Sequence, residues 1–200
     1  GVHKLKTNII RKTITKILTR KKYVEISGSI IPSRYTRFCG AEFKDDNFYL
    51  ESAEKEANRL IDYFQCTQQN RVLDVGCGQG RLPIGILRVI GDINYIGIDV
   101  DLKSINWCKQ YIELKHPFFK FKHLNIYNER YNNNGIKIDR RFCFDVAENS
   151  VDIIYLFSVF SHTTEKDMRA YLKDFSRILD KGGKMFFTTF VEEDVPNVSI

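Results

Sequence analysis

The chain has 200 residues, of which 43% are hydrophobic and 28% are charged. These proportions are typical of one water-soluble globular domain with a three-layer core, and they exclude an intrinsically disordered chain. The longest apolar run, 151–160, contains Asp152 and is shorter than the ~20 residues of a transmembrane helix. No secretory signal pattern is visible, so we expect a cytoplasmic protein without a membrane span.

The five cysteines also favour a reducing compartment. Their number is odd, and they are widely spaced without a CxxC pair, at Cys39, Cys66, Cys77, Cys108 and Cys143. Such a set forms neither a disulfide framework nor a zinc site. We therefore expect small buried hydrophobic side chains at these positions.

The net charge of +6 is concentrated at the start of the sequence. Residues 1–22 hold eight lysines and arginines and no acid, and the remaining 23 basic and 25 acidic side chains give a net charge of −2. A basic arm suits a nucleic acid, an anionic lipid or an acidic partner. It also suits a solvated amphipathic helix, and the lack of a basic excess elsewhere disfavours a nucleic-acid substrate.

The sequence predicts a basic arm and irregular lead-in over residues 1–50 and a core over residues 51–200. Gly28, Pro32 and Gly40 interrupt the stretch 24–50, which favours irregular structure there. A helix is expected at 52–64 from its apolar spacing. Strands and helices then alternate, with strands at 72–75, 94–100, 118–126, 151–158 and 184–190, and helices at 82–90, 102–114 and 165–179.

This alternation predicts βαβ units and a doubly wound, mostly parallel α/β sheet with helices on both faces. The run Lys181-Gly182-Gly183 is expected to end the last helix. A sheet of this kind binds ligands beyond the carboxyl ends of its strands, where the strand order reverses.

The strongest functional signal is the run VLDVGCGQG at 72–80, an apolar strand that leads into three alternating glycines. Glycines let a ligand approach the backbone without meeting a Cβ, and amides at the start of a helix then point at that ligand. A dinucleotide-binding loop requires GxGxxG, but the spacing here is GxGxG, with Arg81 at the place of the third glycine. Asp74 suits a cationic group better than a pyrophosphate because like charges repel. S-adenosylmethionine, with its ammonium and sulfonium, fits these features better than NAD.

A second signal is Asp99, which ends the next predicted strand about twenty residues further on. A carboxylate at this position can accept hydrogen bonds from both hydroxyls of a ribose. Together with the glycine loop, it indicates a ligand that contains adenosine.

The runs VLDVGCGQGRL, YIGIDVD, VDIIYLFSVFSH and YLKDFSRILDKGGKMFFTTF resemble successive motifs of class I S-adenosylmethionine-dependent methyltransferases. The resemblance covers roughly residues 52–190. It implies a Rossmann-like sheet with strand order 3-2-1-4-5 and an enzyme that uses S-adenosylmethionine as methyl donor. The segments INWCKQYI and HPFFKFKHLNIYNERYNNNG further resemble a bacterial subgroup of small-molecule type, whose acceptors are often unassigned.

The resemblance also implies roles for individual residues. The methionine and ribose portions of the cofactor would be lined by Gly76, Gly78 and Gly80. Asp74 would face the methionine amino group, directly or through water, and Asp99 would hold the ribose hydroxyls. Cys77 and Arg81 belong to the same expected cofactor-binding set.

The adenine would be flanked by Val100 and Asp101. The family commonly has Asp at the end of the third strand, whereas this chain has Asn125, followed by Ile126. The side-chain oxygen of Asn125 can still accept a hydrogen bond from the adenine amino group. Near the transferred methyl group we expect Phe157 and Ser158.

Catalysis is less specified, because methyl transfer is an in-line displacement that depends mainly on alignment. His162 is the candidate general base for an acceptor hydroxyl or amine, and a purely structural role is the alternative. Tyr35 and Arg37 could fold over the cofactor and meet its carboxylate. The polar stretch 127–135 lines the acceptor pocket or forms a solvated connection.

The family usually adds two strands after the fifth, but only ten residues follow Phe190. The last predicted strand would then present an apolar edge, which proteins normally cover. We expect either a natural chain that extends beyond Ile200 or a partner strand at this edge.

The favoured function is methyl transfer to a small molecule, such as a sugar hydroxyl. A nucleic-acid methyltransferase that grips its substrate with the basic arm is one alternative. A cofactor-binding scaffold without turnover is another. An NAD-dependent oxidoreductase is disfavoured by Arg81 and Asp74.

Overall fold

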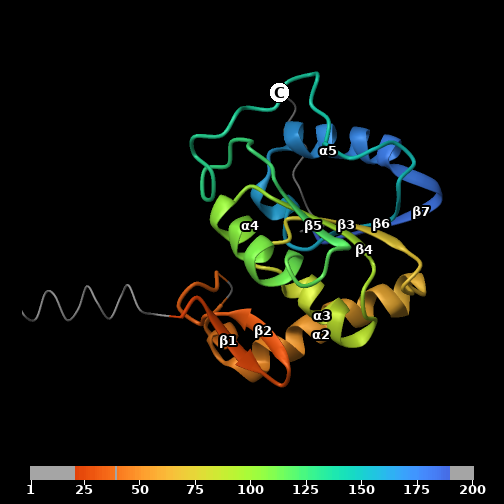
Figure 1. Ribbon diagram of the computed structural model, residues 1–200. Helices are drawn as coiled ribbons and strands as arrows, with labels where there is room; N and C mark the ends of the chain where they lie inside the picture. The colour runs from red at the N-terminus through yellow and green to blue at the C-terminus, as the bar shows by residue number, and fades with distance from the viewer. Residues whose placement is uncertain (1–20, 39, 190–200) are drawn as a thin grey trace, which may run out of the picture. The chain divides into compact units, whose positions relative to one another are not determined.

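The computed structural model of the protein describes residues 21–38 and 40–189 (Figure 1). The chain forms two compact units, one ending at Tyr49 and the other beginning at Leu50. Nearly all of the basic arm falls in residues 1–20 and lies outside the described part. No helix in the described ranges is long and apolar enough to cross a bilayer.

The first unit contains a β-hairpin where irregular structure was expected. Strands β1 (Tyr23–Ile26) and β2 (Ser29–Pro32) pair antiparallel around a two-residue turn. Ser27 and Gly28 have φ values of 48° and 76°, the sign pattern of a type I′ turn. The 3-10 helix η1 (Ala41–Lys44) follows, and helix α2 (Asp46–Phe64) begins six residues before the predicted start. The prediction for 24–50 was wrong because Ser27-Gly28 is a hairpin turn rather than a loop signal.

The second unit is built on a five-stranded sheet in which every neighbouring pair is parallel. Its order is β5-β4-β3-β6-β7, which confirms the predicted order. The strands are β3 (Arg71–Val75), β4 (Asn94–Asp99), β5 (Phe119–His123), β6 (Val151–Leu156) and β7 (Leu179–Phe187).

Helices cover both faces of this sheet, as a doubly wound fold requires. The connections contain α3 (Arg81–Val89), α4 (Leu102–Cys108) with the π-helical turn η2 (Lys109–Glu113), the 3-10 turn η3 (Phe160–His162), and α5 (Glu165–Ile178). In Figure 1, α5 lies on one face of the sheet, and α3 lies on the opposite face. The Rossmann-like architecture predicted from the sequence is therefore confirmed.

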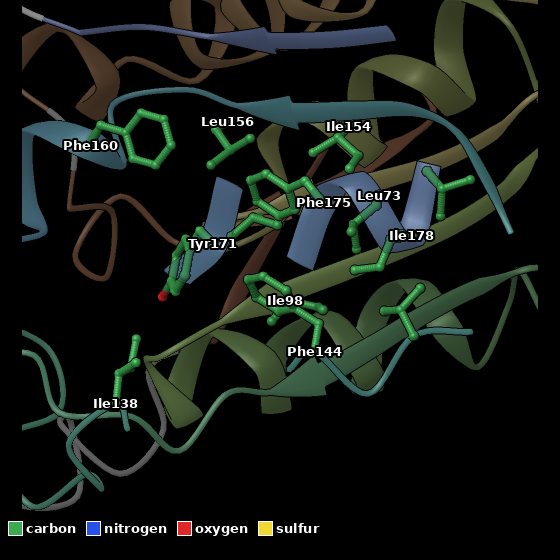
Figure 2. Packing of buried hydrophobic residues seen from close by; sticks show 13 residues of the cluster. Leu73, Ile98, Ile138, Phe144, Ile154, Leu156, Phe160, Tyr171, Phe175 and Ile178 are labelled. Carbon is green, nitrogen blue, oxygen red and sulfur yellow. The ribbon is translucent and has the colours of Figure 1, made fainter. Parts of the chain in front are cut away.

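An apolar core lies on the α5 side of the sheet (Figure 2). Alternate strand residues such as Leu73 and Ile154 point toward this side and are fully buried, since side chains alternate across a strand. They meet Tyr171, Phe175 and Ile178, which share one stripe of α5. The intervening strand residues Asp74 and Tyr155 face the α2 and α3 side by the same alternation.

Helices α2 and α3 approach each other closely on that second side. A Cβ built on Gly85 of α3 would lie 1.9 Å from the carbonyl oxygen of Ala53 in α2. Only glycine fits this contact, which brings the buried stripe of α2 over the start of α3. The residues of that stripe are Ala53, Glu56, Ala57 and Leu60.

The chain enters β7 differently from the prediction. Helix α5 ends at Ile178, and Leu179 already has extended backbone and pairs with Val151. The register then shifts, so that Ile153 pairs with Lys184. Lys181-Gly182-Gly183 therefore forms an irregular part of the strand, with Gly182 at φ 80°, and does not end the helix.

Strand β7 lies at one edge of the sheet. Between residues 21 and 189, leaving out Cys39, no strand pairs with its outer side. Residues 190–200 are not described. A covering strand at this edge therefore stays a prediction.

Candidate functional site

The glycine loop connects β3 to α3 through three residues with positive φ. Gly76, Gly78 and Gly80 have φ values of 83°, 51° and 80°. Residues other than glycine rarely adopt this region of backbone conformation. The N–H groups of Gly76 and Cys77 both donate to the carbonyl oxygen of Ile98, at 2.7 and 3.2 Å. The start of the loop is therefore fixed to the neighbouring strand β4.

The three glycines make room for different neighbours. A Cβ on Gly76 would lie 2.4 Å from Cγ2 of Val159, and a Cβ on Gly80 would lie 2.7 Å from Cδ1 of Ile112. A Cβ on Gly78 would meet nothing within 4 Å. Protein packing therefore accounts for Gly76 and Gly80, whereas Gly78 is the glycine that borders open space.

Asp99 connects the end of β4 to this exposed part of the loop. Its Oδ2 accepts a hydrogen bond from the N–H of Gly78 at 2.7 Å, and its Oδ1 accepts one from the N–H of Asp101 at 2.7 Å. Burial raises the pKa of Asp99, and these backbone hydrogen bonds oppose the rise. Each carboxylate oxygen keeps a second lone pair. The two strongest sequence signals thus meet in one place, with acceptor capacity left for a ligand.

Asp74 lies beneath the loop and is only 3% exposed. Its Oδ2 accepts a hydrogen bond from the hydroxyl of Tyr95 at 2.6 Å. Burial raises the pKa of Asp74 to about 8, although the Tyr95 hydrogen bond acts in the opposite direction. The carboxyl group is therefore largely protonated at neutral pH, and a cation nearby would favour its ionised form. The sequence indicated the acid but not its protonation.

Arg81, the first residue of α3, forms an ion pair with Glu56 of α2. Burial raises the pKa of Glu56, and the guanidinium of Arg81 opposes that rise. Phe157, directly after β6, lies beside the guanidinium groups of Arg81 and of Arg59 in α2. Its ring centroid is 5.5 Å from Cζ of Arg81 and 4.8 Å from Cζ of Arg59. The hydroxyl of Tyr155 accepts a hydrogen bond from Nη1 of Arg59 at 3.3 Å.

Glu56 and Arg59 were missed in the sequence. One signal was available: Glu56 shares its helical stripe with Ala53, Ala57 and Leu60, which predict a buried face. An acid on such a face needs a partner. Nothing in the spacing identified that partner as Arg81, 25 residues away.

On the predicted adenine side, several polar groups already have partners. Oδ2 of Asp101 accepts hydrogen bonds from N and Oγ of Ser104, at 2.9 and 2.6 Å, and so caps α4. The carbonyl oxygen of Val100 accepts one from Nε2 of His123 at 3.1 Å. An adenine role for Val100 and Asp101 stays a prediction.

Asn125 is exposed, and its Oδ1 accepts a hydrogen bond from Nδ2 of Asn132 at 3.1 Å. Ile126, which follows, forms an isolated β-bridge with Ile136. The same segment therefore folds back on itself after β5. One lone pair of Asn125 Oδ1 stays available for an adenine amino group.

His162 is exposed at the end of η3 and is connected to the glycine loop through Val159. The N–H of His162 donates to the carbonyl oxygen of Val159 at 2.9 Å, and Val159 is the residue that packs on Gly76. Ser158 has φ 58°, and its N–H donates to Oγ1 of Thr188 at 2.7 Å. The segment after β6 therefore borders the loop.

The stretch 127–135 reaches the same segment. The ring of Tyr131 makes an edge contact with the ring of His162, with centroids 6.2 Å apart. Nδ2 of Asn128 donates to the carbonyl oxygen of His162 at 3.2 Å. The structure thus brings two sequence-predicted acceptor elements together.

Arg37 already has partners inside the first unit, and a contact with the carboxylate of a cofactor stays a prediction. All five of its N–H donors are used inside the first unit: they bond the carbonyl oxygens of Pro32, Phe43 and Asp45 and Oδ1 of Asp46. Cζ of Arg37 also lies 4.6 Å from the ring centroid of Tyr49. Tyr35 is 66% exposed.

The described cysteines are free thiols, and three of the four are buried. Sγ of Cys77 and Sγ of Cys108 both lie near the carbonyl oxygen of Gly78, at 3.8 and 3.5 Å. Burial raises the pKa of Cys77 well above its usual range, which makes the thiol unreactive. Cys143 is exposed, contrary to expectation, and Cys39 lies outside the described residues.

A family model described as a methyltransferase domain matches residues 49–198. The chain belongs to this methyltransferase domain family. A viral protein named as methyltransferase 235L, from invertebrate iridescent virus 6, is 26% identical over 151 residues, which cover 75% of this chain and 47% of the relative. The chain spans about half the length of the curated relatives it matches.

Solved structures share the fold of this methyltransferase domain. A protein of Pyrococcus horikoshii superposes with a TM-score of 0.52 at 20% identity, over 77% of this chain and 62% of the other. Coclaurine N-methyltransferase, solved with N-methylheliamine and SAH (S-adenosylhomocysteine), gives a TM-score of 0.50 at 17% identity, over 66% and 34% of the two chains.

Proposed function

We propose that the protein transfers the methyl group of S-adenosylmethionine to a small-molecule acceptor. The observation that carries this proposal is the hydrogen bond from Gly78 N–H to Asp99 Oδ2, 2.7 Å long, beside a glycine that borders open space. This combination suits an adenosine: the Asp99 carboxylate can accept hydrogen bonds from the ribose hydroxyls, and the absence of a side chain at Gly78 lets the sugar approach the backbone.

Two acids fit the cofactor's other polar groups. Asp99 has lone pairs free for the ribose hydroxyls, and Asp74 offers a buried carboxyl to the ammonium. When bound, the cofactor supplies an electrophilic methyl carbon on a sulfonium. The chain's own contribution is to orient that carbon toward an acceptor, which is the main requirement of an in-line displacement.

The acceptor is proposed to enter beside η3 and the stretch 127–135. There His162 would take the proton of an acceptor hydroxyl or amine, with Tyr131 against its ring. The exposed side chains of Tyr127, Asn133 and Asn134 in this stretch suit a polar acceptor such as a sugar hydroxyl. Membership of the bacterial small-molecule subgroup belongs to the same proposal.

Calorimetric titration of the purified protein tests the cofactor assignment. We expect S-adenosylmethionine and S-adenosylhomocysteine to bind and NADH not to bind. Asp99→Ala should weaken the binding of both sulfur nucleotides by about 1–3 kcal/mol, because charge-assisted hydrogen bonds are lost. Asp92→Ala is the matched control, since Asp92 is an exposed acid that pairs with His116. Binding of NADH in place of the sulfur nucleotides would overturn the proposal.

Transfer itself is tested separately from binding. The protein is incubated with S-adenosylmethionine and sets of hydroxylated small molecules, amines or RNA, and S-adenosylhomocysteine is measured over time. Acceptor-dependent product with a small molecule supports the proposal. Tight binding without product from any set would favour a scaffold, and RNA-dependent product that falls steeply with salt would favour the nucleic-acid alternative.

A further inference from the structure

A half-buried group of charged and aromatic side chains lies next to the glycine loop, where α2, the start of α3 and the end of β6 come together. It consists of Glu56, Arg59, Arg81, Tyr155 and Phe157. Arg81 directly follows Gly80, and Phe157 directly follows β6. The group therefore lies at the carboxyl end of the sheet, where ligands bind in such folds.

The two cations in this group are held differently. Arg81 forms an ion pair with Glu56. Arg59 forms no ion pair with any carboxylate of the described residues: it donates to the hydroxyl of Tyr155 and lies against the ring of Phe157. The charge of Glu56 acts on it only from beyond ion-pair distance. An arginine has five N–H donors, so Arg59 keeps donors for a further partner.

The group also carries a positive excess. It has two guanidinium groups against the one carboxylate of Glu56. The nearby Asp74 adds little negative charge at neutral pH, because burial raises its pKa to about 8. A half-buried cation without a paired anion is costly, and an anionic ligand group would remove that cost.

We propose that Arg59 binds the α-carboxylate of the cofactor's amino-acid portion through its free N–H donors. This inference rests on the proposed function. The cofactor has one anionic group, and the two acids of the site cannot hold it. Phe157 holds the guanidinium of Arg59 by its ring face at 4.8 Å, and the flat fork of donors suits a carboxylate.

Glu56 is a positioning residue in this arrangement. By pairing with Arg81 it keeps the second guanidinium from competing for the same anion. Arg37 is the weaker candidate for this role, because all five of its N–H donors are already used in the first unit.

The test compares S-adenosylmethionine with its decarboxylated analogue, which keeps the ammonium, sulfonium and adenosine but lacks the carboxylate. Both ligands are titrated into the wild type, Arg59→Met and the control Arg169→Gln by calorimetry. Arg169 is an exposed arginine of α5 paired with Glu165. Arg59→Met keeps a long side chain beside Phe157 and removes the charge.

We expect the wild type and Arg169→Gln to prefer S-adenosylmethionine by about 10- to 100-fold over the analogue. Arg59→Met should lose that preference by binding S-adenosylmethionine more weakly while binding the analogue as the wild type does. Arg59→Lys, which keeps the charge, should restore part of the preference. This last variant also serves if Arg59→Met does not fold.

Three results would overturn the proposal. One is an Arg59→Met protein that still prefers the carboxylate. Another is equal weakening of both ligands, which indicates a structural role. The third is an Arg59→Met protein with unchanged cofactor binding and a raised KM for an anionic acceptor, which would mean that Arg59 binds the acceptor instead. A wild type that binds neither ligand would contradict the proposed function itself, which is a distinct outcome.

Discussion

The hydroxyl of Tyr95 on β4 donates to Oδ2 of Asp74 on β3, at 2.6 Å, and both residues are almost fully buried. This pair lies directly under the glycine loop, since Gly76 follows Asp74 by two residues. Burial keeps the acid protonated in the free protein, with a pKa of about 8. The pair therefore connects the stability of the fold to the charge that the site presents.

Stability should fall as the pH rises from about 5 to 8. The pKa of Asp74 in the folded protein is about 8, above the ~3.9 of an unfolded chain. The folded state then binds the proton more tightly, so this group stabilises at low pH and the contribution is lost as the pH approaches 8. The slope is at most about 1.4 kcal/mol per pH unit.

Urea unfolding of wild type and Asp74→Asn at pH 5, 6.5 and 8 measures this effect. The variant cannot ionise at this position, so its advantage over the wild type should grow with pH. Parallel curves for the two proteins would show that Asp74 titrates normally.

Cofactor affinity should rise with pH between about 5.5 and 7. If the cofactor ammonium approaches Asp74, the ionised carboxylate is favoured, and the proton is released on binding. The upper limit is set by the ammonium, which loses its own proton at a pKa of about 8. Titration in two buffers of different ionisation enthalpy counts the released protons. Asp74→Asn should release none, and an affinity independent of pH in the wild type would place the ammonium elsewhere.

We expect Gly76→Ala to lower the stability of the fold and Gly78→Ala to lower mainly the affinity for the cofactor. Gly76→Ala places a methyl group against Val159, 2.4 Å from Cγ2, and adds strain at positive φ. We expect a loss of about 2–4 kcal/mol in the free energy of unfolding. Gly78→Ala meets no neighbour within 4 Å, and should cost only ~1–2 kcal/mol from its backbone.

The same two variants are titrated with S-adenosylhomocysteine. Gly78→Ala should lose affinity although its fold is retained, because the added Cβ occupies the space proposed for the ribose. Equal unfolding energies for the two variants, or unchanged affinity in Gly78→Ala, would contradict this division of roles.

Removing the carboxylate from the ion pair of Glu56 with Arg81 should lower the free energy of unfolding more than removing it from a second, more exposed pair between the same two helices. Glu56→Ala leaves the guanidinium of Arg81 with its carboxylate partner removed, and the side chains are only 6% and 18% exposed. We expect a cost of about 3 kcal/mol. Glu54 and Arg88 form the matched control, with side chains 35% and 26% exposed, and Glu54→Ala should cost less than ~1 kcal/mol.

Thermal or urea unfolding gives both values. Adding Arg81→Ala to Glu56→Ala should recover part of the loss, since the guanidinium that lost its carboxylate partner is then removed as well. Equal costs for Glu56→Ala and Glu54→Ala would mean that water reaches both pairs alike.

The sheet was predictable from the sequence because each strand and helix carries its own local pattern. Asp99 and the glycine loop could be placed together because neighbouring parallel strands end at the same edge of the sheet: Asp99 ends β4, and the loop follows β3. The hairpin at 23–32 was missed because four-residue strands give little periodicity, and Ser-Gly was taken as a loop signal.

The rest of the site depends on contacts between distant parts of the chain. That Gly76 makes room for Val159, or that Glu56 pairs with Arg81, follows from packing and not from spacing. The protonation of Asp74 follows from burial, which depends on α2 and α3 as much as on β3. The four hydrogen-bond acceptors around Arg37 are likewise visible only in the folded first unit.

The most direct test of the central claim is a crystal structure of the protein with S-adenosylhomocysteine. The account predicts that both ribose hydroxyl oxygens lie within about 3 Å of the Asp99 carboxylate, with the sugar over Gly78 and the amino-acid portion toward Asp74 and Arg59. An adenosine bound away from Gly78 and Asp99 would contradict it.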